Sequence, residues 1–247
     1  MTKRLPLVHI AAALALLVVG GPPAAGTASA APRGDAQVLR FNFDNGESLR
    51  PGTRVRNVAG RGEGRVLVSD GGRLRRVEGV RGRGAKFPAA CGTCGKAIIE
   101  AGDRNSFDPR RRGFTYGAVL KMTPSEGNSD SNIVQKGYFS QAGGQYKLQT
   151  DQGRPSCVVN GRAGRLIARS NVDVSNRRWH RVTCQRTRTA VILRIDGAVR
   201  GRARGVTGHL ANEAPIRVGG RKVAGVETDQ YHGRLDNVFV TIRGARR

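Results

Sequence analysis

Hydrophobic side chains alternate with polar ones over short stretches of this chain, which is the spacing of β-strands with one buried face. The longest alternating runs are residues 38–43, 114–122, 179–186, 190–195 and 235–242. Shorter runs lie at 65–69, 97–100, 132–135, 145–150, 157–159, 161–167 and 216–218. Gly, Asn, Asp and Pro separate these runs, and no long window has the spacing of an amphipathic helix. The pattern predicts an all-β fold built as an antiparallel sandwich of two sheets.

Residues 50–84 are the hardest part of the chain to interpret, because they hold ten Arg and nine Gly with few large apolar side chains. We interpret them as short strands, such as 65–69, joined by glycine turns. Disorder over parts of this stretch is the alternative, since low hydrophobicity combined with high charge disfavours a packed core.

The N-terminus has the pattern of a cleavable secretion signal over residues 1–30. A positive start at Lys3 and Arg4 leads into an apolar run over 5–19, then helix-breaking Gly and Pro, and Ala28-Ser29-Ala30 forms a small-x-small cleavage site. A retained anchor is the alternative, but the run is shorter than the roughly 20 residues that a membrane span needs. No later segment is long and apolar enough to span a membrane.

We therefore expect a secreted, extracellular protein, with the cell wall as one setting. A short extension at 31–37 precedes a single domain at 38–243, and a basic tail at 244–247 follows it.

The formal net charge is +25, or +23 once residues 1–30 are removed. Such a charge attracts polyanions over a Debye length of about 8–10 Å. Outside a cell the candidates are anionic wall polymers, acidic polysaccharides, shed DNA and anionic lipid. A solvated basic surface without a dedicated partner is the alternative. No recognised nucleic-acid motif is present, so any contact with nucleic acid is expected to be non-specific and driven by charge.

Four cysteines, Cys91, Cys94, Cys157 and Cys184, lie in the exported part. An even count in a secreted chain predicts disulfides, and four cysteines allow three connectivities. We favour a local Cys91–Cys94 bridge with a long-range Cys157–Cys184 bridge. A zinc site and a redox-active Cys91–Cys94 pair are the alternatives; the zinc site lacks a second close pair and the redox pair lacks a βαβ context.

The C-terminal third holds an ordered series of motifs. They are Trp179-His180-Arg181-Val182, Leu193-Arg194-Ile195-Asp196-Gly197, Ile216-Arg217-Val218-Gly219-Gly220 and Tyr231-His232-Gly233-Arg234-Leu235-Asp236-Asn237-Val238. The series resembles the laminin G-like domain of the concanavalin A-like lectin/glucanase superfamily. Segments 41–46, 84–87, 114–119 and 133–137 resemble the N-terminal half of that domain.

The resemblance spans about 38–243 and implies a jelly roll of two antiparallel sheets, one of them concave. It places the strand of Cys157 near the strand of Cys184, which supports the long bridge. It also implies that Trp179 packs inward and that His180 and His232 are structural.

Glucan-cleaving enzymes of the same superfamily carry E-x-D-x-x-E along one strand, because the nucleophile and the acid must point the same way. No such strand is present here; the nearest segment is Glu227-Thr228-Asp229, which we expect to be a solvated loop. No Ser/His/Asp set stands out, and the histidines lack metal-ligand spacing. We therefore expect a protein without catalytic activity.

Calcium is the one cofactor that the resemblance implies, because similar sandwiches tie their first and last strands with such an ion. Asp44 and Asp236 are the candidate ligands, together with backbone oxygens near Gly46. The alternative is that Asp44 caps a turn and Asp236 pairs with an arginine.

Four basic residues, Lys147, Arg181, Arg194 and Arg217, alternate with core positions and should project outward. Arginine suits bidentate contacts with carboxylate, sulfate or phosphate, so these residues are the candidates for polyanion binding. The sequence favours a secreted, non-catalytic binding module for an extracellular glycan or anionic polymer. The alternatives are a hydrolase or lyase acting on acidic polysaccharides and a structural surface or adhesion protein; the oligomeric state is left open.

Overall fold

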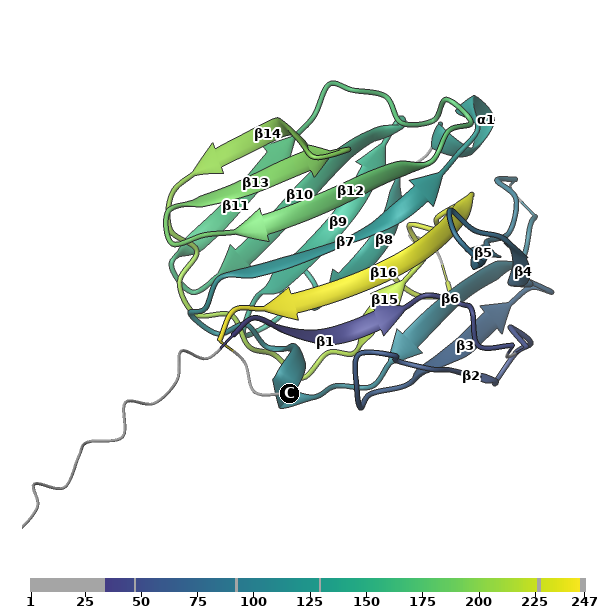
Figure 1. Cartoon of the computed structure of the whole chain (residues 1–247), viewed down its shortest axis with the longest axis horizontal. Coiled ribbons are helices and arrows are strands. Elements are labelled where there is room, and N and C mark those ends of the chain that lie inside the picture. The colour runs from purple at the N-terminus through teal and green to yellow at the C-terminus, as the bar shows by residue number, and fades with distance from the viewer. Residues whose placement is uncertain (1–33, 47, 92, 129, 226–227, 245–247) are drawn as a thin grey trace, which may run out of the picture. The chain divides into compact units, whose positions relative to one another are not determined.

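A computed structural model describes residues 34–46, 48–91, 93–128, 130–225 and 228–244, which all fall within the unit Pro32–Arg247. The segment interpreted as a secretion signal lies outside the described residues. In the described part, two antiparallel sheets of eight strands each are stacked face to face (Figure 1). The prediction of an all-β, two-sheet jelly-roll sandwich is confirmed.

The first sheet, sheet A, has the strand order β14-β13-β12-β7-β16-β5-β4, and β1 pairs with β16. Its strands are β1 (Ala36–Phe41), β4 (Arg75–Glu78), β5 (Arg83–Lys86), β7 (Phe114–Lys121), β12 (His180–Arg186), β13 (Ala190–Ile195), β14 (Ala198–Arg204) and β16 (Arg234–Ile242). The first and last strands of the domain therefore lie side by side (Figure 1).

The second sheet, sheet B, has the order β11-β10-β9-β8-β15-β6-β3-β2. Its strands are β2 (Arg54–Val55), β3 (Gly64–Ser69), β6 (Lys96–Ala101), β8 (Ser131–Lys136), β9 (Gln145–Asp151), β10 (Arg154–Gly161), β11 (Gly164–Arg169) and β15 (Ile216–Val218). The helical elements of the described part are one 3₁₀ turn, η1 (Asn105–Phe107), and a four-residue helix, α1 (Pro124–Gly127), and neither is long and apolar enough to cross a membrane.

The core fills the space between the sheets because each strand turns its apolar residues inward. In β7, Phe114, Tyr116, Ala118 and Leu120 are buried, and in β13 the same holds for Val191, Leu193 and Ile195. The residues that alternate with these positions form the two outer faces of the sandwich, and any binding surface on the strands must be built from them.

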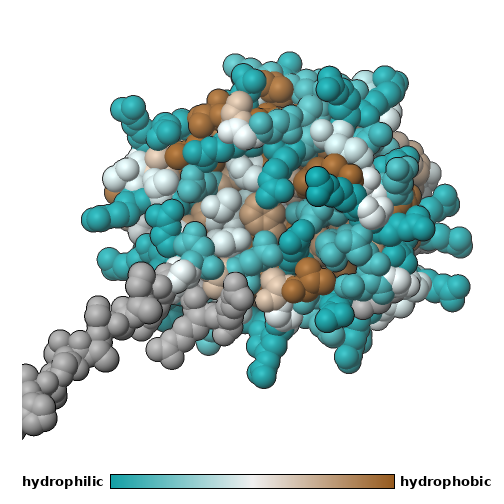
Figure 2. Space-filling view, viewed as in Figure 1, coloured by the Kyte–Doolittle hydropathy of each residue, from teal (hydrophilic) through white to brown (hydrophobic). Residues whose placement is uncertain are grey.

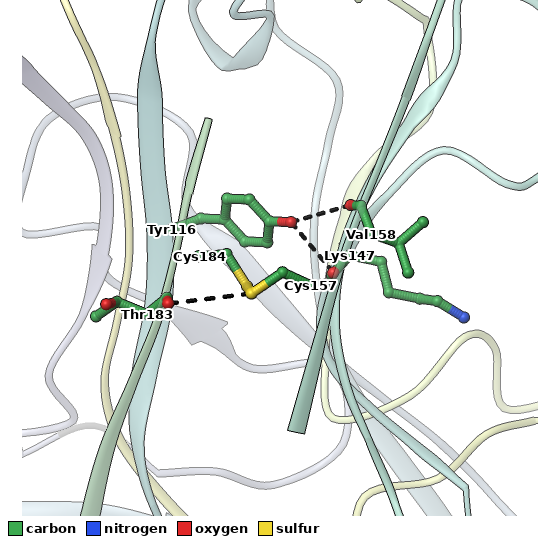
Figure 3. The surroundings of a disulfide bond; sticks show 6 residues. All are labelled: Tyr116, Lys147, Cys157, Val158, Thr183 and Cys184. Atoms are coloured by element: carbon green, nitrogen blue, oxygen red, sulfur yellow. Dashed lines mark hydrogen bonds between the residues drawn. A yellow bond between two sulfur atoms is a disulfide. The ribbon is translucent and has the colours of Figure 1, made fainter. Parts of the chain in front are cut away.

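The Cys157–Cys184 disulfide joins β10 of sheet B to β12 of sheet A, and both cysteines are fully buried (Figure 3). Beside it, the hydroxyl of Tyr116 crosses from β7 and donates to the carbonyl oxygens of Lys147 and Val158, at 3.2 and 3.0 Å (Figure 3). Burial raises the pKa of the Tyr116 hydroxyl, so it remains a donor at any physiological pH. The Cys157–Cys184 disulfide and the Tyr116 hydroxyl thus join the two sheets at neighbouring positions.

The second disulfide, Cys91–Cys94, closes a short loop before β6, and the described part contains no free cysteine. The connectivity that the sequence favoured is therefore the one present. Residues 50–84 are also ordered, since they supply β2, β3, β4 and the start of β5. The alternating runs did not include β14, which follows the Asp196-Gly197 turn as an exposed edge strand.

Edge strands β14 and β11 close one side of the sandwich. A Cβ atom at Gly201 would lie 2.3 Å from the carbonyl oxygen of Arg169, and one at Gly205 would lie 3.0 Å from the Leu166 side chain. Only glycine permits so close an approach at position 201. The edges of the two sheets therefore meet along a seam that carries arginines from both.

Candidate functional site

The four predicted polyanion-binding residues lie on two opposite faces of the sandwich. Arg181 of β12 and Arg194 of β13 alternate with the buried residues of sheet A and lie on its outer face. Lys147 of β9 and Arg217 of β15 lie on the outer face of sheet B by the same reasoning. Since the core separates these faces, the four residues do not form one site.

On sheet B the two predicted residues, Arg217 and Lys147, lie near carboxylates. Arg217 Nε lies 2.7 Å from Glu100 Oε2, and its guanidinium lies 5.5 Å from the ring centre of Tyr138. Burial lowers the pKa of the Lys147 ammonium and the positive charge of Arg221 adds to this effect, while the carboxylates of Asp229 and Asp130 oppose it. Lys147 and Arg217 themselves therefore offer an anionic ligand little uncompensated charge.

On sheet A the two predicted residues, Arg181 and Arg194, have no acidic partner among the described residues. The Arg181 guanidinium lies 5.3 Å from the ring centre of Phe239, and Arg194 donates to Gln185 Oε1 at 2.8 Å. Arg202 and Arg204 of β14 pair with Ile192 and Ala190 of β13 and are exposed on the same side.

Among the described residues, no carboxylate lies within 4 Å of these four guanidinium groups. We call Arg181, Arg194, Arg202 and Arg204 the arginine face. Figure 2 shows that this side of the molecule is largely hydrophilic, with scattered apolar patches.

Aromatic side chains near the surface are few. Trp179 is only partly buried and lies outside the hydrophobic core, so the expectation that it packs inward is wrong. It comes just before β12, where the strand leaves the sheet and the alternation no longer determines burial. Phe139 is 62% exposed, and the Arg165 guanidinium lies 4.6 Å from its ring centre. These rings are too scattered to form a broad platform for neutral sugars.

Asp44 and Asp236 both contact the loop 79–83 between β4 and β5. Asp236 Oδ2 accepts from the Val80 amide at 3.0 Å, and Asp44 Oδ1 accepts from the Arg83 amide at 2.8 Å. A Cβ atom at Gly82 would lie 2.2 Å from Asp44 Oδ1, so this position, at φ 64°, requires glycine. The loop thus brings together the two carboxylates predicted as calcium ligands.

Two oxygen atoms of this region are buried without a hydrogen-bond donor: Asp236 Oδ1 and Asn42 Oδ1. Asn42 Nδ2 donates to Asp44 Oδ2 at 2.8 Å, which ties the amide to the same cluster. Burial raises the pKa of Asp236, backbone amides oppose the shift, and the charge of Asp44 raises it further. These groups would gain from a bound cation.

Among the described residues, no group of three or more His, Cys, Asp or Glu side chains is arranged to hold a metal. A calcium ion between Asp44 and Asp236 would need amide and backbone oxygens as well, and calcium accepts both. The carboxylates of Asp44 and Asp236 and the side-chain oxygen of Asn42 are oxygen donors of the kind that calcium accepts, so this region fits a calcium ion.

The carboxylates nearest to a catalytic pattern lie at one end of sheet B. Asp229 Oδ2 accepts from Asn132 Nδ2 at 2.9 Å, whereas Glu227 lies outside the described residues. Burial raises the pKa of Asp130, and the neighbouring carboxyl groups of Asp151 and Asp229 raise it further. These three carboxylates come from separate segments and not from the single strand that carries the catalytic pair in glucan-cleaving enzymes.

The histidines predicted to be structural have protein partners. His180 Nδ1 lies 2.7 Å from Asp196 Oδ2 and its Nε2 lies 3.0 Å from Asn176 Oδ1. His232 Nδ1 lies 2.9 Å from the carbonyl oxygen of Pro88. These contacts anchor the starts of β12 and β16.

The fold and its two outer faces define a jelly-roll domain of the lectin type. The model of a laminin G family, described as belonging to the concanavalin A-like lectin/glucanases superfamily, matches residues 95–243. The chain therefore belongs to this family, as the resemblance implied. No curated protein sequence matches the chain.

Solved structures with the same fold include the binding domain of Paraclostridial Mosquitocidal Protein 1, at 14% identity and a TM-score of 0.60 over 85% of this chain and 50% of that one. Domain 4 of AbnA, an extracellular GH43 arabinanase from Geobacillus stearothermophilus solved with arabinotriose, has 12% identity and a TM-score of 0.60 over 85% of this chain and 94% of that domain. The receptor binding domain of botulinum neurotoxin D has 13% identity and a TM-score of 0.57 over 85% and 50%. This chain thus spans about half the length of the two toxin domains.

Proposed function

We propose that this domain is a secreted, non-catalytic module that binds an extracellular glycan or another anionic polymer. The arginine face carries the proposal, because three of its four arginines are exposed, Arg194 is partly exposed, and none has an acidic partner in the described part of the chain. Guanidinium groups bind carboxylate, sulfate and phosphate in bidentate fashion. The likeness to toxin binding domains and to an arabinanase domain supports a binding role.

Two other functions remain as alternatives: a hydrolase or lyase acting on acidic polysaccharides, and a structural adhesion protein without a small ligand. The carboxylates of Asp130, Asp151 and Asp229 come from separate segments and give the hydrolase or lyase no support. A structural adhesion protein should show no binding to any of the polymers in a binding assay.

Polymer binding is expected to depend on the arginine face and on salt. Wild-type protein should bind dextran sulfate, with affinity falling steeply as NaCl rises, and should not bind neutral dextran. Replacing Arg202 and Arg204 by Gln should weaken binding roughly 3- to 10-fold, because each exposed ionic contact contributes up to about 1 kcal/mol.

The matched control is Arg65→Gln with Arg73→Gln, which removes the same charge from exposed positions elsewhere. Biolayer interferometry over a salt series measures both variants. An equal loss of affinity in the two variants would mean that binding depends on net charge alone and not on the arginine face. If the wild-type protein binds none of dextran sulfate, polygalacturonate and DNA at low salt, the structural adhesion protein is favoured.

We also propose that Asp44 and Asp236 hold a calcium ion that joins the first and last strands of the domain. Chelation should lower Tm, since a ligand at 100 times its Kd stabilises the folded state by about 2.7 kcal/mol. Asp236→Asn should remove this calcium dependence while the protein stays folded, because a neutral amide suits the buried position. Asp70→Asn, an exposed carboxylate elsewhere, is the control.

The calcium effect should also depend on pH. Without calcium, the raised pKa of Asp236 means that the folded state binds a proton more tightly, so stability falls as pH rises through that pKa. Calcium binds the ionised carboxylate, so the calcium-dependent rise in Tm should shrink as pH falls through the same range. Scanning calorimetry with and without EDTA measures this, and metal analysis showing no calcium in reloaded wild-type protein would contradict the site.

A further inference from the structure

A pocket of about 430 Å³ lies at the end of the sandwich where β12 and β14 finish, on the left in Figure 1. The turn 187–189 and the segment 206–208 form its walls, and Arg111 and Arg186 complete the lining. The pocket adjoins the arginine face, because Ala190, which follows the turn, pairs with Arg204. Its volume is in the range of small-ligand sites.

Arg186 is a buried cation without a counter-ion. It is 4% exposed, because it takes the inward position that follows Val182 and Cys184 along β12. Its guanidinium donates to the carbonyl oxygens of Arg110, Arg112 and Gly208 and lies 4.8 Å from the ring centre of Phe114. No carboxylate of the described residues lies within 4 Å. Burial lowers its pKa to about 10, so it stays charged at neutral pH.

The other lining groups add positive charge and hydrogen-bond donors. Arg111 and Arg188 are exposed and form no ion pair in the described part of the chain. Thr187, Thr189 and Thr207 contribute hydroxyl groups, and Val206, 57% exposed, gives an apolar contact. No acidic residue lines the pocket, and three of its lining residues, Arg111, Arg186 and Arg188, are arginines. The buried Arg186 guanidinium has hydrogen-bond acceptors but no counter-ion, and an anion in the pocket would supply one.

We propose that this pocket binds the sulfate or phosphate ester of one sugar residue in a polymer that runs along the arginine face. A sulfate or phosphate ester presents three terminal oxygens, which suits the exposed guanidinium groups of Arg111 and Arg188, with the buried charge of Arg186 beside them, better than a carboxylate does. The volume leaves room for the sugar ring that carries the ester, and Val206 offers a contact for its apolar side. This assignment rests on the proposed function, which it makes specific to an esterified glycan.

The test uses the full secreted protein with inorganic sulfate and inorganic phosphate as probes, at constant ionic strength maintained with NaCl. Isothermal titration should show saturable 1:1 binding to wild-type protein. Arg111→Gln with Arg188→Gln should weaken it at least tenfold, while the control Arg65→Gln with Arg73→Gln leaves it unchanged. Both pairs replace exposed side chains, so the variants are expected to fold. The tighter of the two probes identifies the ester.

Sulfate can also raise Tm through a general salt effect, which does not saturate and is equal in all variants. If only such a rise is observed, the proposed ester site in the pocket is wrong. Dextran sulfate separates this failure from failure of the proposed function. Suppose that Arg202→Gln with Arg204→Gln weakens dextran sulfate binding and Arg111→Gln with Arg188→Gln does not. The proposed ester site in the pocket is then wrong, and the proposed polymer-binding function stands. If inorganic sulfate binds at the pocket and no polymer binds, the pocket stands and the polymer function fails.

Discussion

Replacing Cys157 and Cys184 by Ala is expected to lower the free energy of unfolding by about 3–4 kcal/mol. The bridge joins the two sheets across a sequence separation of 27 residues, and loss of loop closure in the unfolded chain accounts for most of that value. The tyrosine hydroxyl beside the bridge keeps its two carbonyl acceptors, so the sheets should stay together with the native fold.

The other disulfide provides the matched control for this experiment. Cys91 and Cys94 have a sequence separation of 3, so the same model gives less than about 2 kcal/mol for their replacement. Urea denaturation followed by fluorescence gives both values. A long-range variant that loses no more stability than the local one would show that the bridge between the sheets does not hold the sandwich together.

Replacing Lys136 by Met is expected to cost about 3–5 kcal/mol, because it leaves a buried carboxylate without its partner. Lys136 is fully buried in β8, and its Nζ lies 2.8 Å from Asp103 Oδ1, 3.0 Å from Asp108 Oδ1 and 3.1 Å from Asn212 Oδ1. Asp108 is itself 4% exposed. The cluster ties the loop before β7 and the segment before β15 to sheet B.

Adding Asp108→Asn to Lys136→Met should recover part of the loss, and a double-mutant cycle measures the coupling. Burial already raises the pKa of Asp108 and Lys136 opposes that shift, so the pKa should rise further in the Met variant. The folded variant then binds a proton more tightly, and its deficit relative to wild type should narrow as pH falls through the raised pKa.

Lys96→Met serves as the control for the buried cluster, because the Lys96–Asp70 pair is separated by 3.5 Å and its carboxylate is largely exposed. Exposed pairs contribute up to about 1 kcal/mol. A similar loss in both variants would mean that Lys136 acts through packing and not through its charge.

The sequence predicted the strands whose large apolar residues alternate, such as β7, β12 and β13, because burial of one face directly determines that pattern. It did not show β14, where Gly201 and Ala203 occupy the inward positions and Arg fills the outward ones. A close approach of β11 needs small residues there, so the tertiary contact itself removed the apolar signal.

The candidate site was harder to predict than the fold. Alternation predicted that Arg181 and Arg217 project outward, but it carries no information about which sheet they belong to. It also could not show that Glu100, 117 residues away, pairs with Arg217. Arg186 does carry a signal in the sequence, because it occupies an inward position of β12, where a charge without a counter-ion is unexpected. Such a violation of the pattern marks a residue with a special environment.

The seam between β11 and β14 has a consequence for the behaviour of the protein at high concentration. An edge strand exposes unpaired backbone groups and is a template on which a strand of another molecule can add. Here one edge lies against the other, and Arg202 and Arg204 project along β14 at every second position. Two copies that approached edge to edge would bring like charges together. The arginines proposed to bind a polyanion therefore also oppose edge-to-edge pairing of two copies along β14.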